Sequence, residues 1–597
     1  RWSASTGRSC HRSVFRAVNH AARRKSMHPD PSMHLVTKSY FDTFCANFAS
    51  PFDDAKNFEA FTAYCAFTRY SADNVEATDL VYDGADSGID GALLFLDDRA
   101  VFSADELEEI FKSSRREFHV TVVLTQAKRS VTWSKQEIDS FVAAITDYLS
   151  EAPKQPHSQF LADFKSMFQL LFKNIGRIRG GLPDLHTYFF TAAPDTDAVE
   201  INAAFDAGLI AIGALGYSND TKLVKAHRDV IHEYWLAADG PVEASLTTVG
   251  YAPFPAAQSI NNAYVATVKA RSFIQAILKD QHGVPRKKLF EENVRDFLGV
   301  DADVNAEIAG TLGDANKKAR FGLMNNGVTI VASSVRPSGQ EIYIRDFQIV
   351  NGCQTSNVLI ALDDQTDDTV SLMVKLIEAD NPAVIDDIVR ATNRQSKVED
   401  AQFVSTMATL RDLERYFNAR GAGEANRLYF ERRKGQYGPE NVAPVRIFDV
   451  RETARCYSAT VMMRPDLASR YPNRLTGELL SEVFGAGKPE EDYYTACFCH
   501  YRLRMLTSNK RFDGKYSKLR WHIMTAAVKY CSAKYKEWRC KTRNEALYNL
   551  FASNDGEWFE RLDTLIKTSI PDPDLSRDVL KSPPLTNTTL ANVDQLL

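Results

Sequence analysis

The hydrophobic pattern of residues 33–240 predicts strands that alternate with helices. The run HVTVVLTQAK (119–128) is β-branched and almost continuously apolar, which is typical of a buried strand. Apolar residues then recur at helical spacing from Ile138 to Leu149, after a capping box formed by Ser134 and Glu137. Because strand and helix signals alternate, we expect one mixed sheet with flanking helices.

A second alternation covers residues 241–450, after the proline-punctuated stretch YAPFPAAQ. Its strand signals are GVTIVAS (327–333) and IYIRDFQIV (342–350), and helical patterns follow each of them. Residues 451–597 are dominated by Leu-, Tyr- and Arg-rich helical patterns. We therefore predict an α/β multidomain protein with a helical, partly basic C-terminal domain.

Residues 1–32 precede these patterns and read differently. The first 26 residues contain seven Lys or Arg and no acid, and Met27 and Met33 follow closely. An Arg-rich, acid-poor segment fits a transit peptide, but an over-extended start explains it better. We expect a disordered or mis-annotated extension.

Composition limits the classes of function. With 44% hydrophobic and 25% charged residues in a chain of 597, the protein is globular. Its net charge of −5 means that nucleic-acid binding would need local basic patches. Nine thinly spread cysteines favour a reducing, cytoplasmic location. The longest apolar stretch, 207–217, is too short to span a bilayer, so we expect no membrane partner.

Polar residues on two predicted strands form the first candidate site. Asp90 lies between glycines at the start of one strand, and Gln126 and Lys128 share a face of the next strand. If the strands are neighbours, the acid, the amide oxygen and the ammonium group converge, and Glu59 on the preceding helix can add a second carboxylate. Carboxylate and amide oxygens hold Mg²⁺ or Mn²⁺, and an ammonium group can position water for phosphodiester hydrolysis.

A structural interpretation of the same residues stays open. Gly-x-Asp-Gly is also an ordinary turn, and Gln-x-Lys is also an ordinary solvated strand end. The catalytic interpretation further requires the acidic insertion 97–117 to loop out between the two strands.

A resemblance favours the catalytic interpretation. The segments Phe58-Glu59, Gly88-Ile89-Asp90-Gly91 and Gln126-Ala127-Lys128 resemble the PD-(D/E)xK nuclease superfamily. They are closest to its Mrr-like branch, in which Gln replaces the second acid. The resemblance implies a restriction-endonuclease-like mixed sheet. It also implies that Asp90 is a metal ligand, Gln126 and Glu59 assist it, and Lys128 is catalytic.

Five segments between residues 289 and 437 carry a second resemblance. They read LFEENVRDFLG, FGLMNNGVTIVAS, FQIVNGCQTSNVL, ATNRQSKVEDAQF and LYFERRKGQY. This series resembles the AIPR (abortive infection phage resistance) family, whose members often carry a nuclease-like domain ahead of this region. The resemblance implies an α/β AIPR core and a role in bacterial defence against phage.

The same segments contain amide and basic groups that can contact a base or nucleotide. FQIVNGCQTS predicts a buried strand, a turn at Gly352 and a helix start that Thr355 and Ser356 can cap. The candidate binding residues are Asn325, Asn326, Asn351, Gln354, Thr355, Asn393, Gln395, Arg432 and Arg433. The alternative is that these amides only join turns to strands in a structural core.

Two smaller signals lie near the C-terminus. Residues 501–543 hold thirteen Lys or Arg and two acids, with interleaved aromatics, which suits contact with a phosphate backbone. A solvated helix face over a core explains them equally well. Cys497, Cys499 and His500 lack a second Cys or His pair nearby, which favours packed thiols over zinc.

The leading hypothesis is a Mg²⁺-dependent endonuclease that cleaves DNA in anti-phage defence. The middle domain would recognise nucleic acid, a nucleotide or a phage-derived trigger, and cutting two strands favours a homodimer. One alternative is a nucleic-acid- or nucleotide-binding sensor with a degenerate nuclease fold. Another is a scaffold that assembles a defence complex through its helical region.

Overall fold

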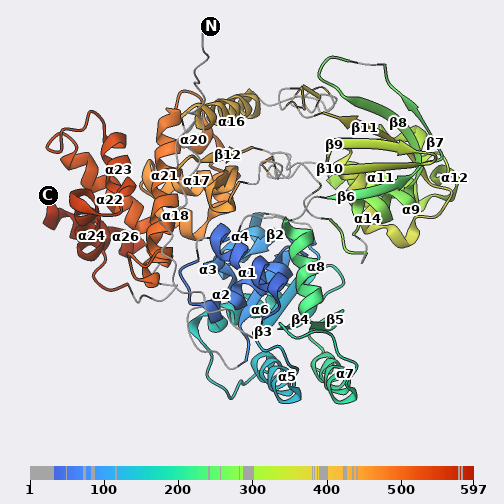
Figure 1. Cartoon of the computed structure of the whole chain (residues 1–597), viewed down its shortest axis with the longest axis horizontal. Helices are drawn as coiled ribbons and strands as arrows, with labels where there is room; N and C mark the ends of the chain where they lie inside the picture. The colour runs from blue at the N-terminus through green and yellow to red at the C-terminus, as the bar shows by residue number, and fades with distance from the viewer. Residues whose placement is uncertain are drawn as a thin grey trace, which may run out of the picture.

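The computed structural model describes residues 33–597 with short gaps. The gaps fall at residues 49, 72–74, 82–87, 98, 114–116, 240–241, 256, 281–282, 287–288, 290–301, 380, 382–383, 386, 389–390, 392–400, 421–425, 433–435, 438–441, 574, 576–578 and 580–582. Three lobes are visible: an N-terminal sheet at the bottom, a middle sheet to the right and a helical lobe to the left (Figure 1).

The N-terminal lobe is a five-stranded mixed sheet of order β2-β1-β3-β4-β5. Strand β1 pairs antiparallel with β2 and β3, whereas β3, β4 and β5 run parallel. One face packs on α1, α2 and α8, and the other on α4, α5, α6 and α7. The strands are β1 (Gly91–Leu96), β2 (Arg99–Val101), β3 (Val120–Lys128), β4 (Asp184–Thr191) and β5 (Thr221–Ala226). The helices are α1 (Leu35–Phe48), α2 (Asp54–Phe67), α3 (Ala77–Leu80), α4 (Ala104–Ser113), α5 (Lys135–Leu149), α6 (Gln159–Lys173), α7 (Val199–Gly213) and α8 (Arg228–Asp239).

Local sequence explains most of this lobe. All residues of β3 up to Ala127 are buried, as its continuous apolar run predicts. Ser134 caps α5, because its hydroxyl accepts a hydrogen bond from the N–H of Glu137 at 3.3 Å. The expectation that residues 97–117 loop out from between the two strands is confirmed, because β1 pairs directly with β3 and the described residues of the insertion lie outside that pair. These residues are nevertheless not a plain loop. They form β2 and α4, because Leu107, Ile110 and Phe111 lie on one helical face and are buried.

The middle lobe is a six-stranded sheet of order β6-β10-β9-β11-β8-β7. Its two predicted strands form the long hairpin β9–β10, and β11 runs parallel to β9. The strands are β6 (Glu243–Thr247), β7 (Gly250–Pro253), β8 (Asn262–Lys269), β9 (Val328–Ser338), β10 (Glu341–Asn351) and β11 (Ser371–Glu378). The helices are α9 (Ala270–Phe273), α11 (Ala302–Gly313), α12 (Ala315–Lys318), α13 (Phe321–Met324) and α14 (Cys353–Ala361).

The C-terminal lobe has one helical core. That core includes Leu410, Phe417 and Phe448, so the described residues between 410 and 450 pack with the C-terminal helices rather than with the middle sheet. A short parallel pair, β12 (Tyr429–Glu431) and β13 (Ile447–Asp449), joins it. The helices are α16 (Ala401–Arg420), α17 (Val450–Thr460), α18 (Pro465–Arg470), α19 (Pro472–Thr476), α20 (Leu480–Phe484), α21 (Glu490–Ser508), α22 (Arg520–Lys534), α23 (Arg543–Ala552), α24 (Gly556–Ser569) and α26 (Pro583–Val593).

Within the described ranges, every helix is too short or too polar to cross a membrane.

Candidate functional site

Asp90 is fixed against strand β3 by its backbone and its side chain. Its N–H donates to the carbonyl of Thr125 at 2.8 Å, and its carboxylate Oδ2 accepts from the N–H of Ala127 at 2.8 Å. Ala127 separates Gln126 from Lys128, so the carboxylate lies at the strand end that carries both side chains. A Cβ on Gly91 would lie 2.6 Å from the hydroxyl of Thr125, so glycine permits this close strand approach.

Glu59 reaches the same place from α2. Burial, followed by the negative charge of Asp90, raises the pKa of Glu59 to about 6, while Lys56 and Lys128 act in the opposite direction. The Glu59 carboxylate also accepts a hydrogen bond from Lys56 at 2.6 Å. Two carboxylates and an ammonium group are therefore close enough to interact electrostatically, and the two like charges favour a bound cation.

The surroundings of the Gln126 side chain fit a metal site. Its side chain is 4% exposed, and its carbonyl Oε1 has no hydrogen-bond partner among the described residues. A buried amide oxygen without a partner is costly unless a donor or a cation satisfies it. Glu59, Asp90 and Gln126 thus offer oxygen donors of the kind that Mg²⁺ prefers near the end of β3. Sequence reasoning missed Lys56, whose only signal is its place one helical turn before Glu59.

The two Asn-Gly turns of the middle lobe lie against each other. Gly352 adopts φ +87° at the start of α14, and a Cβ there would lie 2.8 Å from the carbonyl of Gly327. Gly327 has φ +77°, and a Cβ there would lie 2.4 Å from the carbonyl of Met373. Both glycines are needed for conformation and for close packing. The two Asn-Gly segments therefore have a structural role in the middle lobe.

Part of the chain that contains these Asn-Gly turns also matches a known protein family. Residues 290–564 match the family model of the AIPR protein. The AIPR match covers β9, β10, α14 and most of the helical lobe, and it begins after the N-terminal sheet. It therefore does not bear on the nuclease resemblance. Neither a curated protein nor a solved structure matches the chain significantly.

The predicted binding residues of the AIPR segment have different surroundings. Asn325 donates to the carbonyl of Phe321 at 2.9 Å and ends α13, while Asn326 is exposed. Asn351 and Gln354 are half-buried on either side of Gly352. Asn393, Gln395 and Arg433 lie outside the described residues.

Thr355 and Ser356 do not cap α14. The helix begins at Cys353, directly after the N-cap residue Gly352, and the side chains of Thr355 and Ser356 are buried inside its first turn. The capping prediction is therefore wrong, because the left-handed conformation of Gly352 starts the helix earlier. Arg432 is nearly buried, and its Nε donates to Glu414 at 2.9 Å, so this guanidinium group has an internal role.

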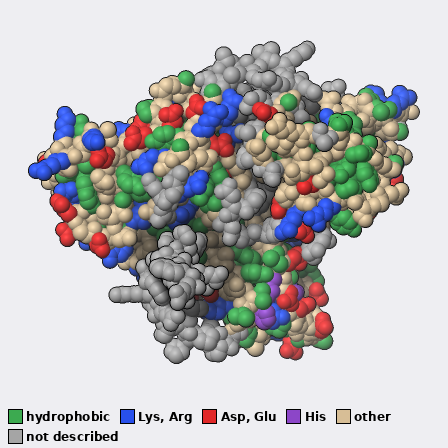
Figure 2. All heavy atoms as spheres, turned by 45° about the horizontal axis from the view of Figure 1, so that its top comes forward, with side chains coloured by type: hydrophobic (Ala, Val, Ile, Leu, Met, Phe, Trp, Pro, Cys, Tyr) green, Lys and Arg blue, Asp and Glu red, His purple; other side chains and the backbone are tan. Residues whose placement is uncertain are grey.

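The basic stretch 501–543 is divided between core and surface. Arg502, Arg520 and Trp521 are buried, whereas Lys510 and Lys515 are exposed. On the face that Figure 2 shows, Lys and Arg side chains are mixed with Asp and Glu. Phosphate contact would therefore rest on a few exposed cations.

Two further clusters have metal-ligating chemistry. Asp184, His186 and Asp220 approach one another at one end of the N-terminal sheet. Each is already paired: His119 contacts Asp184 at 2.8 Å, Lys222 contacts Asp220 at 2.9 Å, and Tyr70 bonds Nδ1 of His186 at 2.6 Å. The second cluster is Glu452, Cys456 and His500, of which the last two are buried. One oxygen of Glu452 binds Arg455, but its other oxygen and both ring nitrogens of His500 have no hydrogen-bond partner among the described residues.

Proposed function

We propose that the chain is a Mg²⁺-dependent endonuclease, with DNA as its favoured substrate, that acts in bacterial defence against phage. The observation that supports this proposal is that Glu59 interacts electrostatically with Asp90 and Lys128 near the end of β3, the strand that also carries the unsatisfied carbonyl of Gln126. The five-stranded mixed sheet with helices on both faces is compatible with a restriction-endonuclease-like domain. The AIPR match favours a role in abortive infection or phage resistance.

In this proposal, Asp90, Glu59 and Gln126 would hold the metal ion. Mg²⁺ bound there would supply charge neutralisation and a more acidic water. The ammonium group of Lys128 would hold the attacking water oxygen and offset charge that develops on the phosphate. Asp90 keeps its position because the N–H of Ala127 binds its carboxylate. Cleavage of both strands of DNA would call for two such sites, hence a homodimer.

The test is an incubation of supercoiled plasmid, linear DNA and single-stranded RNA with the protein, with and without Mg²⁺. Lys128→Ala should lower the cleavage rate by about a hundredfold or more, as loss of a transition-state donor does. Lys135→Ala is the matched control, because Lys135 is exposed on α5 and pairs only with Asp139 one turn away. Equal cleavage by wild type and Lys128→Ala, or no cleavage of any substrate, would refute the proposal.

One observation favours the sensor alternative. The position that would carry a second strand acid holds Gln126, so Asp90, directly before β1, is the one acid that the β1–β3 pair brings to the site. A sensor would bind nucleic acid in a salt-dependent way with no Mg²⁺-dependent cleavage. Filter binding over a salt series, run beside the cleavage assay, separates the two functions.

A further inference from the structure

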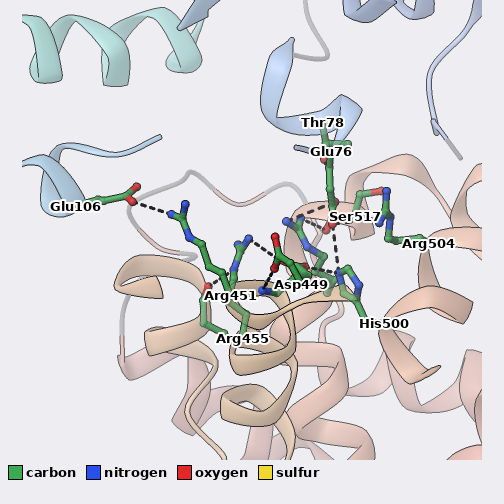
Figure 3. Close-up of polar contacts among 12 residues, drawn as sticks. Glu76, Thr78, Glu106, Asp449, Arg451, Arg455, His500, Arg504 and Ser517 are labelled. Carbon is green, nitrogen blue, oxygen red and sulfur yellow. Dashed lines mark hydrogen bonds and ion pairs between the residues drawn. The ribbon is translucent and has the colours of Figure 1, made fainter. Parts of the chain in front are cut away.

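Helices α17 and α21 bring three metal-ligating side chains together at the junction of two lobes. Glu452 and Cys456 are one turn apart on α17, and His500 faces them from α21. One ligand atom from each lies within 4.8 Å of the others. Glu76 enters the same place from the N-terminal lobe, as Figure 3 shows above His500.

The surroundings of His500 leave the hydrogen-bonding capacity of its ring nitrogens unsatisfied. The ring is fully buried, stacks on Trp521 with centroids 4.9 Å apart, and has no well-formed hydrogen bond at either nitrogen among the described residues. Its Nε2 lies 3.3 Å from Oε1 of Glu76 and 3.5 Å from Oε1 of Glu452. Neither oxygen accepts a hydrogen bond in the same part of the chain, although Nε of Arg504 lies 3.8 Å from Oε1 of Glu76.

The second oxygen of each carboxylate, Oε2, already faces an arginine. Oε2 of Glu452 binds Arg455 at 3.0 Å, and Oε2 of Glu76 faces Arg520 at 3.5 Å. A neutral imidazole carries one N–H, so Nε2 can satisfy at most one of the two remaining oxygens. The geometry therefore leaves a place for a cation among two carboxylate oxygens, a ring nitrogen and a thiol.

The separations fit a metal ion better than hydrogen bonds. With bonds of about 2.0–2.1 Å to nitrogen and oxygen, a tetrahedral zinc ion sets neighbouring ligand atoms about 3.3–3.4 Å apart. The observed contacts of 3.3 and 3.5 Å match this spacing and exceed the usual N–H···O length of about 2.9 Å.

We propose that Glu452, Cys456 and His500 bind a zinc ion, with Glu76 as the fourth ligand, and that this ion joins the N-terminal lobe to the C-terminal helices. Binding breaks the S–H bond of Cys456 and forms an S–Zn bond, and the proton leaves to solvent with no change of oxidation state. A cleft of about 20 Å³, room for one water or ion, is lined by Glu76, Arg504 and Arg520, so it touches the cluster at Glu76 alone.

The surrounding arginines make thiol ionisation essential. Arg455, Arg504 and Arg520 face Glu76, Glu452 and Asp79, so the cluster is formally balanced before a metal enters. Burial, and then the neighbouring thiol of Cys497, raises the pKa of Cys456. Zinc must therefore displace the Cys456 proton, and its affinity should rise with pH. The proposal is independent of nuclease activity.

The test measures metal content on full-length protein purified without chelator and then equilibrated with Zn²⁺. Wild type and Asp90→Asn should each retain one zinc ion per chain, because Asp90 belongs to the separate oxygen site. Cys456→Ala and His500→Gln should lose it. Glu76→Gln should weaken binding by at least the ten- to hundredfold that outer-shell partners contribute.

Cys499→Ala is the matched control. Cys499 is also a buried thiol on α21, but its thiol lies near Cys531 and outside the cluster. This variant should retain zinc. No zinc after equilibration, or zinc retained by Cys456→Ala, would overturn the proposal.

A second measurement covers variants that fail to fold. Co²⁺ added to apo wild type should produce the thiolate-to-metal charge-transfer absorption of cysteine ligation, and Zn²⁺ should abolish it. Absence of that band, or Co²⁺ bound with oxygen ligands alone, would also overturn the proposal.

Discussion

Arg451 and Glu106 meet across the boundary between the N-terminal and helical lobes, 345 residues apart in sequence and 2.9 Å apart in space. Glu106 is buried, and its other oxygen accepts from the N–H of Phe102 at 3.2 Å. Two further pairs, Arg470–Asp105 and Arg474–Glu109, extend this contact along α4. The acidic helix is thus a docking surface for arginines of α17, α18 and α19.

Arg451→Ala should destabilise the protein strongly. Removal of one member of a buried ion pair leaves the other charge without compensation, which costs about 3–5 kcal/mol. Chemical denaturation would measure the change in the free energy of unfolding. Arg415→Ala removes an exposed pair with Asp412 and should cost at most about 1 kcal/mol. Similar losses in the two variants would show that the contact between lobes contributes little.

The raised pKa of Glu59 predicts a pH dependence of stability. The folded pKa of about 6 exceeds the ordinary value of 4.5, so the folded state holds the proton more tightly between these values. The stabilisation from Glu59 protonation is therefore complete below about pH 4.5 and is lost as pH rises through 6. Thermal unfolding from pH 4.5 to 7 should show wild type losing stability relative to Glu59→Gln.

Asp90→Asn tests the cause of that pH dependence. The negative charge of Asp90 is the second largest contribution to the raised pKa, after burial. In proteins that carry Asp90→Asn, the loss of stability between pH 4.5 and 7 relative to the Glu59→Gln variant should therefore be smaller. An unchanged loss would mean that burial alone sets the pKa of Glu59.

Gly352→Ala should destabilise the middle lobe. A side chain there adopts an unfavourable positive φ and also presses on the backbone of Gly327, for a combined cost of about 3 kcal/mol. Gly339→Ala is the control, since Gly339 has φ +63° but open space around it and should cost about 1–2 kcal/mol. Equal free energies of unfolding for the two variants would mean that the contact between the Asn-Gly turns relaxes easily.

Exposed lysines before α22 are the test of nucleic-acid binding by the helical lobe. Replacing Lys510 and Lys515 by Glu should weaken binding uniformly across sequences and reduce the slope of log K against log salt by about 1–2. Lys135→Glu on α5 is the control for net charge. Fluorescence anisotropy over a salt series measures both slopes, and unchanged slopes would assign binding to another surface.

Strands and amphipathic helices could be predicted because their signals are local. The runs that became β3, β9 and β10, and the cap at Ser134, need only neighbouring residues to be recognised. The number of Lys and Arg residues in a segment does not predict a basic surface, because some of these side chains are buried with polar partners. Arg502 and Arg520 belong to a Lys- and Arg-rich segment, yet both are buried. No local signal could indicate that His500 lies beside Glu76, since that contact depends on how two lobes pack.

The position of Glu106 decides how the protein should be divided for experiment. A fragment that stops at residue 240 would keep this carboxylate and lose the guanidinium group that covers it, exposing an anionic, partly apolar helix to water. Such a fragment would aggregate or refold locally around α4, and a lack of activity in it would carry no information about the intact protein. Substitutions in the complete polypeptide are the sounder route.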